Sequence, residues 1–172
     1  RGLELVEAGC DVIDVGGGIG VPDREGKPAI DLTRLDAKLA SLRAALGNIE
    51  LWMEPGRFLV AEAGVLLARV TQTKSKADVR YVGIATGMNS LIRPALYGAH
   101  HDIHNLTRLE SAETELINIV GPICESADYL GHDRLLPVTR EGDVLLIATA
   151  GAYGAVMSSR YNLREPAAEL AI

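Results

Sequence analysis

The stretch DVIDVGGGIGVPD, residues 11–23, joins a short apolar run to three consecutive glycines. The run DVIDV, residues 11–15, predicts a buried strand, and residues 16–20 predict a loop at its end. A glycine loop after a strand exposes backbone N–H groups that no side chain shields, and such donors suit phosphate. A tight strand-to-helix turn needs the same glycines. The loop alone therefore leaves a phosphate site and a structural turn equally open.

The spacing of the glycines excludes the common nucleotide-binding loops. The G-x-G-x-x-G pattern counted from Gly16 places Val21 at its last glycine, and the pattern counted from Gly18 places Asp23 there. A P-loop needs glycine, lysine and then serine or threonine, and the chain contains no such run. A phosphate carried by a cofactor other than a nucleotide remains as the functional interpretation.

The first third of the chain follows a parallel α/β pattern. Residues 3–8 predict the end of a helix that leads into the first strand. The segment DLTRLDAKLASLRAALG then predicts a helix that begins at a capping box of Thr33 and Asp36 and ends at Gly47. Its leucines are spaced three and four residues apart and form one face: Leu32, Leu35, Leu39, Leu42 and Leu46. The segment IELWMEPG supplies the next strand, so the order is helix, strand, glycine loop, helix, strand.

The secondary-structure pattern that the sequence predicts changes near residue 64. Short β-rich runs follow one another between turn residues: GVLLARVTQTK, VRYVGIAT, TELINIVGPI, GDVLLIATAGAY and PAAELAI. No long helical pattern returns after this point. The second part of the chain therefore predicts an antiparallel β domain, a barrel or a sandwich.

The composition narrows the class of protein. The chain has 172 residues, of which 48% are hydrophobic, and a formal net charge of −6 without a basic stripe, which argues against a nucleic-acid partner. No apolar run reaches the roughly 18 residues of a membrane span, so no membrane partner is expected. Cys10 and Cys124 lie far apart and suggest no disulfide framework, so we expect a reducing cytoplasm. Cys10 lies in no functional motif and is expected to be in the core. Without an initiator methionine, the sequence is expected to be a piece of a longer protein, cut at both ends.

Five segments, taken in order, resemble a known family. They are GGG at 16–18, EPGR at 54–57, GMNSLIRPALYGAHH at 87–101, GPICES at 121–126 and AGAYG at 150–154. Together they resemble the fold-type III pyridoxal-phosphate decarboxylases, and most closely the diaminopimelate decarboxylases. The third and fifth segments are particularly similar to the bifunctional proteins that fuse aspartate kinase to this decarboxylase.

The resemblance implies a mixed fold, α/β plus all-β. Residues 1–63 are expected to be the last βα units of a (β/α)8 TIM-like barrel that binds pyridoxal phosphate. Residues 64–172 are expected to form the β-barrel domain found at the C-terminus of alanine racemase and these decarboxylases, lacking its final strand or strands. The family also implies a homodimer with shared active sites.

The resemblance also implies which residues hold the cofactor, pyridoxal 5′-phosphate. The amides of the glycine loop would bind its phosphate, with a backbone contact from Gly56 and the hydroxyl of Tyr153. Glu54 would keep the ring nitrogen protonated, which makes the ring a better electron sink. Arg57 would bind the phosphate or the substrate carboxylate through its guanidinium fork. The implied set is Gly16, Gly17, Gly18, Glu54, Gly56, Arg57 and Tyr153.

The implied substrate is meso-2,6-diaminopimelate, which would lose CO2 to become L-lysine. Diaminopimelate carries an amino acid group at each end, so its distal carboxylate needs a cation, and Arg93 with Tyr97 resembles the pair that holds this end. The thiol of Cys124 would return a proton to the carbon that loses CO2, and Glu125 would bind the distal ammonium. Ornithine and arginine decarboxylases should not need Arg93, because their substrates lack the distal carboxylate.

Some features depart from the family, and other functions stay open. Thr149 and Ala85 stand where many members carry aspartate, and the lysine that attaches the cofactor belongs to an earlier part of the barrel, so the chain alone is expected to be inactive. An ornithine or arginine decarboxylase, an amino-acid racemase and a non-catalytic module remain as alternatives. His100, His101 and His104 lie close in sequence, but without a second group of acidic ligands they do not predict a metal site.

Overall fold

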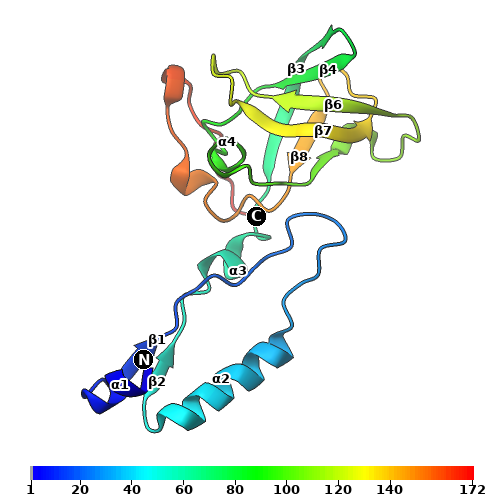
Figure 1. Ribbon diagram of the computed structural model, residues 1–172. Coiled ribbons are helices and arrows are strands. Elements are labelled where there is room, and N and C mark those ends of the chain that lie inside the picture. The colour runs from blue at the N-terminus through cyan, green and yellow to red at the C-terminus, as the bar shows by residue number, and fades with distance from the viewer. Residues whose placement is uncertain (1) are drawn as a thin grey trace. The chain divides into compact units, whose positions relative to one another are not determined.

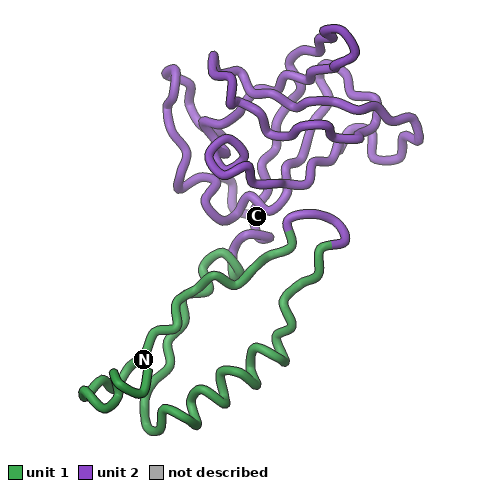
Figure 2. The backbone as a smooth tube through the Cα atoms, in the orientation of Figure 1, with its two compact units in different colours: residues 1–22, 27–59 green, residues 23–26, 60–172 purple. Residues whose placement is uncertain are grey.

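The computed structural model describes residues 2–172, and the chain divides into two compact units (Figure 2). The first unit runs to residue 22 and resumes over residues 27–59. The second unit contains residues 23–26 and 60–172. None of the helices in the described part of the chain has the length and apolar character of a membrane span.

The first unit contains the predicted parallel α/β pattern (Figure 1). Its two strands, β1 and β2, pair in parallel, with Ile13 opposite Leu51. Because both strands run the same way, the glycine loop after β1 and the EPGR segment after β2 follow the same edge of this sheet. The elements in order are α1 (Gly2–Glu7), β1 (Val12–Asp14), α2 (Leu32–Leu46), β2 (Glu50–Trp52) and α3 (Gly56–Val60).

Helix α2 begins two residues earlier than the predicted capping box. Its N-cap is Asp31, whose backbone is extended and whose carboxylate accepts a hydrogen bond from the Arg34 N–H at 2.9 Å. Thr33 is therefore already helical, and the prediction that it caps the helix is wrong. The predicted end is confirmed, since Gly47 has φ = +81° and its N–H donates to the Arg43 carbonyl. The burial of the leucines increases along the predicted apolar face of the helix. Leu32 is exposed, Leu35, Leu39 and Leu42 are partly buried, and Leu46 is buried.

The second unit is a six-stranded sheet with the order β5-β8-β3-β4-β6-β7 (Figure 1). The end strands β5 and β7 also contact each other, so the sheet nearly closes into a barrel. The prediction of an all-antiparallel domain is wrong at one pair, because β4 and β6 are parallel. The long connection that carries α4 and β5 returns the chain to the starting end and makes this pairing possible. The elements are β3 (Leu66–Lys76), β4 (Val79–Ile84), α4 (Arg93–Tyr97), β5 (Ile103–Asn105), β6 (Thr114–Val120), β7 (Tyr129–Pro137) and β8 (Val144–Ile147), with 3₁₀ turns at Leu106–Arg108, Ala155–Met157 and Tyr161–Leu163.

Strand β3 spans both halves of the barrel. Residues 66–69 pair with β8, and residues 70–76 pair with β4. The register shifts between Val70 and Gln72, which is the mark of a β-bulge. A bulge bends the strand, so one long strand contributes to both sides of the core.

The core of the barrel is aliphatic and lies between the strands. Alternate residues of β3 point inward, and the same alternation buries one side of β8. The largest fully buried apolar side chains are Ile84, Leu91, Ile117, Ile119, Leu130, Leu145 and Ile147. Two sequence predictions fail outside this core. Residues 166–172 form no strand, because the Ala167 N–H donates to the Ser90 hydroxyl instead of a neighbouring strand, and Cys10 is exposed in the segment between α1 and β1.

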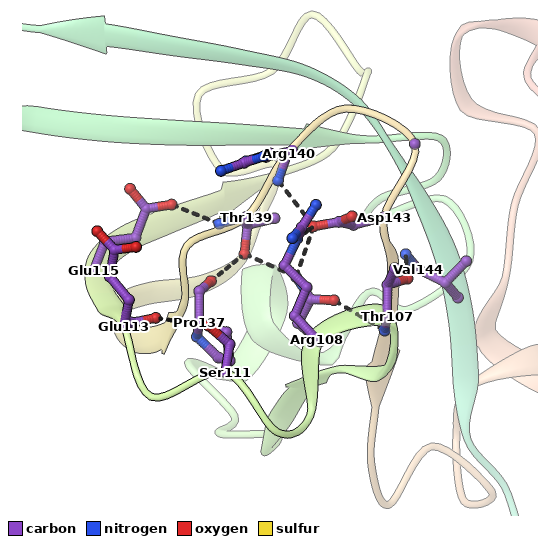
Figure 3. Close-up of polar contacts among 12 residues, drawn as sticks. Thr107, Arg108, Ser111, Glu113, Glu115, Pro137, Thr139, Arg140, Asp143 and Val144 are labelled. Atoms are coloured by element: carbon purple, nitrogen blue, oxygen red, sulfur yellow. Dashed lines mark hydrogen bonds and ion pairs between the residues drawn. The ribbon is translucent and has the colours of Figure 1, made fainter.

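A buried polar network stabilises the corner of the barrel where β7 and β8 are joined (Figure 3). The Asp143 side chain is 4% exposed, and its Oδ2 accepts hydrogen bonds from Arg108 Nε at 2.7 Å, Asn105 Nδ2 at 3.0 Å and the Arg140 N–H at 2.9 Å. Burial by itself raises the pKa of the Asp143 carboxyl, but the hydrogen bonds from Arg108, Asn105 and Arg140 outweigh burial and lower the pKa below its usual value. The ionised carboxylate is therefore part of the fold.

The lowered pKa of Asp143 makes the stability of this unit depend on pH. A carboxyl with a depressed folded-state pKa stabilises the fold above its unfolded pKa of about 3.9, and this contribution is lost as the pH falls through the folded pKa. We expect Asp143→Asn to lower the free energy of unfolding at pH 7 by about 2–3 kcal/mol and to remove this acid-side dependence. Urea unfolding between pH 7 and pH 2, followed by amide exchange in β8, measures both effects. An Asn variant with unchanged stability would show that the charge is dispensable.

Candidate functional site

The three glycines after β1 each have a local reason to be glycine. Gly16 and Gly18 have φ = +74° and +78°, a region that residues with a side chain rarely adopt. Gly17 packs directly on the Glu54 carbonyl, and an added Cβ would overlap that oxygen. The Gly16 N–H donates to Asp14 Oδ1 at 2.7 Å, and its carbonyl accepts from the Glu54 N–H at 2.9 Å. The loop is therefore a tight turn that is fastened to the end of β2.

The same loop also presents unused donors. Within residues 2–172, no acceptor is bound to the backbone N–H groups of Gly17, Gly18 or Gly20, and all three residues are exposed. Space around Gly18 and Gly20 is open, with no atom within 4 Å of a built Cβ. A ligand with several acceptor oxygens, such as a phosphate, matches this set of bare amides.

The EPGR segment lies beside the glycine loop in the first unit. The Gly56 N–H donates to the Glu54 carbonyl at 2.9 Å, which turns the chain into α3. The side chains of Glu54 and Arg57 are exposed. The first unit thus brings six of the seven predicted cofactor residues to one sheet edge, where ligands bind in parallel α/β folds.

Arg93 opens α4 in the second unit, and a buried histidine holds its guanidinium. Pro94 follows Arg93 inside the helix, and Gly98 at φ = +61° ends it. Arg93 Nη1 lies 3.1 Å from Nε2 of His101, which is fully buried. His101 Nδ1 lies 2.8 Å from the Ala148 carbonyl, just after β8. A carbonyl only accepts, so Nδ1 carries the proton and Nε2 accepts from Arg93.

The charge state of His101 agrees with this arrangement. Burial lowers the pKa of its imidazole, the hydrogen bond to the Ala148 carbonyl partly opposes this, and the nearby charge of Arg93 lowers the pKa further. His101 is therefore neutral at pH 7. The Thr149 hydroxyl donates to the Ala148 carbonyl at 2.8 Å and lies 3.3 Å from His101 Nδ1.

Two of the three histidines that are close in sequence face different partners. His100 lies within hydrogen-bond distance of Asp102 and Arg134, whereas His101 faces Arg93. Among residues 2–172, no group of three histidine, cysteine or acidic side chains is arranged to hold a metal ion. His100 and His101 therefore belong to separate hydrogen-bond networks.

The GPICES loop exposes the predicted reactive side chains, and the buried Asp128 carboxylate holds the loop in place. Cys124 and Glu125 are exposed, and Glu125 Oε2 lies 3.4 Å from the Tyr161 hydroxyl. Asp128 is 3% exposed, and its two oxygens accept from the Met88 N–H at 2.6 Å and the Ile123 N–H at 2.8 Å. One carboxylate thus joins the GPICES loop to the GMN turn.

The AGAYG segment forms a strained turn. Thr149 and Tyr153 have φ = +53° and +61°, which is uncommon for residues with a side chain. The Gly151 N–H donates to the Ala61 carbonyl at 3.0 Å, and a Cβ on Gly151 would overlap backbone atoms of the 60–64 segment. Tyr153 is 44% exposed. Strained residues of this kind gather at functional sites.

The predicted site residues thus fall into two groups, one in each unit. The first unit holds the glycine loop with Glu54, Gly56 and Arg57, and the second holds Arg93, Tyr97, Cys124, Glu125 and Tyr153. Sequence reasoning missed the roles of three polar residues that contact the second group: His101 contacts Arg93, and Asp128 and Tyr161 contact Glu125. His101 and Asp128 each lie in or just after a quoted segment, which was the only available signal.

Comparison with known proteins decides the family. Residues 10–151 match the model of the pyridoxal-dependent decarboxylase C-terminal sheet domain. The chain belongs to the pyridoxal-dependent decarboxylase family. This confirms the predicted fold class, which includes the C-terminal sheet domain of the fold-type III enzymes, and it confirms pyridoxal phosphate as the family's cofactor.

The relatives of this decarboxylase chain include diaminopimelate decarboxylases. The chain is 40% identical to the diaminopimelate decarboxylase of Archaeoglobus fulgidus, and this match covers 99% of the chain and 41% of the relative. It is 43% identical to the diaminopimelate decarboxylase of Neisseria meningitidis serogroup A, and this match covers 93% of the chain and 38% of the relative. The crystal structure of diaminopimelate decarboxylase from M. jannaschii in co-complex with L-lysine matches with a TM-score of 0.85 and 38% identity, over 95% of this chain and 39% of that one. The chain therefore spans about two fifths of the length of these relatives.

The residues present fit the cofactor of the family. The bare amides of Gly17, Gly18 and Gly20 suit the phosphate, and no side chain occupies the space next to Gly18 and Gly20. Glu54 offers an exposed carboxylate at the same sheet edge, where it would pair with a protonated ring nitrogen. No metal is required by this donor set, since amide N–H groups and a guanidinium bind anions.

Proposed function

We propose that the intact protein decarboxylates meso-2,6-diaminopimelate to L-lysine and CO2. One observation carries the choice of substrate: a cation, Arg93, is held in the second unit by a buried neutral histidine. Diaminopimelate keeps a carboxylate at the end that does not react, whereas ornithine and arginine have none there. A fixed guanidinium is the group that recognises such a carboxylate.

The first unit is proposed to hold the cofactor. Amides of the glycine loop bind the phosphate, with Gly56 and Arg57 adding contacts, and the Tyr153 hydroxyl is a further proposed phosphate ligand. Glu54 keeps the ring nitrogen protonated. Bound in this way, pyridoxal phosphate supplies the electron sink that makes loss of CO2 feasible.

The second unit is proposed to hold the substrate and return the proton. Arg93 and Tyr97 bind the distal carboxylate, and Glu125 binds the distal ammonium. The Cys124 thiol donates a proton to the carbon that has lost CO2. Cys124 and Glu125 are exposed on one loop, which supports a homodimer in which this loop completes the active site of the other subunit.

The glycine loop gives a direct test of cofactor binding. We expect Gly17→Ala to weaken pyridoxal phosphate binding about tenfold or more, because an added Cβ would push the loop away from the Glu54 carbonyl. Lys38→Ala is the control, since it changes an exposed residue of α2 in the same unit and leaves the glycine loop intact. The measurement is a cofactor titration of the intact protein, followed by absorbance. Equal affinities in the two variants would refute the phosphate role of the loop.

The proposed reaction is tested by comparing substrates. The intact protein, loaded with pyridoxal phosphate, should release CO2 from meso-2,6-diaminopimelate at least about 10²-fold more efficiently than from ornithine or arginine, because only the first substrate satisfies Arg93. A preference for ornithine or arginine would identify a diamine-forming decarboxylase. Racemisation without CO2 release would identify a racemase, and cofactor binding without turnover would identify a non-catalytic member.

A further inference from the structure

The structure assigns His101 as the positioning residue that fixes the Arg93 guanidinium for the distal carboxylate of the substrate. This inference rests on the proposed function and adds a residue to it. His101 itself is fully buried, so it does not contact the substrate. It acts through the orientation of Arg93.

The imidazole connects two elements of the barrel. Nδ1 donates to the Ala148 carbonyl at 2.8 Å, which fixes the ring to the end of β8. Nε2 accepts from Arg93 Nη1 at 3.1 Å, which fixes the guanidinium on α4. A free arginine side chain samples many rotamers, and holding it in one costs conformational entropy on binding. In the folded protein this contact already holds the guanidinium, so less conformational entropy is lost when a carboxylate binds it.

The neutral state of the imidazole is essential to this role. Each ring nitrogen has a separate task, one as donor and one as acceptor, and only the neutral ring performs both. The groups that face the ring are Arg93 from α4, the neighbouring His100, Arg134 from β7, and the Ala148 carbonyl and Thr149 hydroxyl after β8. None of these is a carboxylate that would favour a charged imidazole.

Two substitutions separate the two bonds of the ring. Asparagine places its amide near the position of Nδ1, so His101→Asn keeps a donor for Ala148 and removes the acceptor for Arg93. Glutamine places its amide near the position of Nε2, so His101→Gln keeps an acceptor for Arg93 and removes the donor for Ala148. The pair therefore tests the contact to Arg93 against the contact to β8.

Two ligands separate carboxylate recognition from general binding. L-lysine keeps the distal carboxylate of diaminopimelate, whereas cadaverine is the same chain without that carboxylate. Inhibition constants of both ligands are measured on the intact holoenzyme, together with KM and kcat for diaminopimelate. We expect His101→Asn to raise the inhibition constant of L-lysine and the KM by about tenfold, the equivalent of one charge-assisted hydrogen bond, with little change in kcat or in cadaverine inhibition. His101→Gln should stay within about threefold of the wild type for both ligands.

The possible results distinguish the positioning role of His101 from the proposed reaction. A wild-type protein that does not decarboxylate diaminopimelate refutes the proposed function. Normal wild-type activity with a folded His101→Asn variant of unchanged L-lysine inhibition refutes the positioning role alone. Equal losses for L-lysine and cadaverine also refute it. If His101→Asn does not fold, the glutamine variant decides by its ratio of the two inhibition constants, and if neither folds, His101 serves the fold and the proposal fails.

Discussion

Replacing Cys124 with alanine is expected to lower kcat for diaminopimelate about 10²–10⁴-fold while leaving KM within about threefold. The reason is the assigned role of the thiol, which donates a proton after CO2 has left and takes no part in holding the distal end of the substrate. General acids positioned in this way contribute rate enhancements of this size. The measurement is steady-state release of CO2 by the intact holoenzyme.

The chain offers its own control for this substitution. Cys10 is the second free cysteine, and it is also exposed, but it lies in the first unit between α1 and β1. Cys10→Ala is expected to keep full activity. If the two alanine variants have the same kcat, the proton comes from another group and the assignment of Cys124 is wrong.

A mixing experiment extends the same prediction to the proposed dimer. Cys124→Ala is defective in the second unit, and Gly17→Ala is defective in the first. If one subunit supplies the glycine loop and the other supplies Cys124, a mixed dimer contains one intact site and one site with both defects. At a pyridoxal phosphate concentration too low to load the Gly17→Ala sites, mixing the two variants should then restore on the order of a quarter of wild-type activity. No recovery would place both groups in the same subunit's site.

The fold followed from the sequence where local patterns determine structure. Leucine spacing gave helix α2, and Gly47 gave its end, because a left-handed cap residue is a local requirement. The start of α2 was misplaced, since Asp31 and Thr33 are both good caps and only the backbone conformation chooses between them. The parallel pairing of β4 with β6 could not be derived either, because register and direction between distant strands depend on the path of the intervening chain.

In the candidate site, too, local features were predictable from the sequence and long-range contacts were not. Exposed backbone at Gly17 and Gly18 was predictable, because glycine has no side chain that could cover its N–H group. The contacts of His101 and Asp128 were not predictable, since both residues act on groups many positions away in the sequence. Histidines 100, 101 and 104 suggest one cluster when they are read along the chain, yet folding turns His100 and His101 toward different partners. Long-range hydrogen bonds are set by tertiary structure, and a single sequence carries no direct record of them.

Removing the carboxylate of Asp128 is expected to have the largest effect on stability. Asp128→Ala should lower the free energy of unfolding by roughly 3–6 kcal/mol, because it leaves the buried N–H groups of Met88 and Ile123 without acceptors, at about 1–3 kcal/mol each, and opens a cavity. Asp128→Asn preserves the volume but turns an amide donor toward one of those N–H groups, so it should also be destabilising. Urea unfolding of the chain measures both losses.

The glycines around Asp128 show why the site depends on this one carboxylate. A Cβ on either Gly87 or Gly121 would overlap the Asp128 oxygens, so both turns are shaped to admit them. Asp133→Asn is the matched control, because it makes the same chemical change on an exposed residue of β7 and should alter stability by less than about 0.5 kcal/mol. The Ile123 N–H binds the Asp128 carboxylate, and Ile123 directly precedes Cys124. Because a change at Asp128 would shift the position of Cys124, any folded Asp128→Asn protein should also show a lower kcat. A variant as stable and as active as Asp133→Asn would mean that the two loops keep their places without the carboxylate.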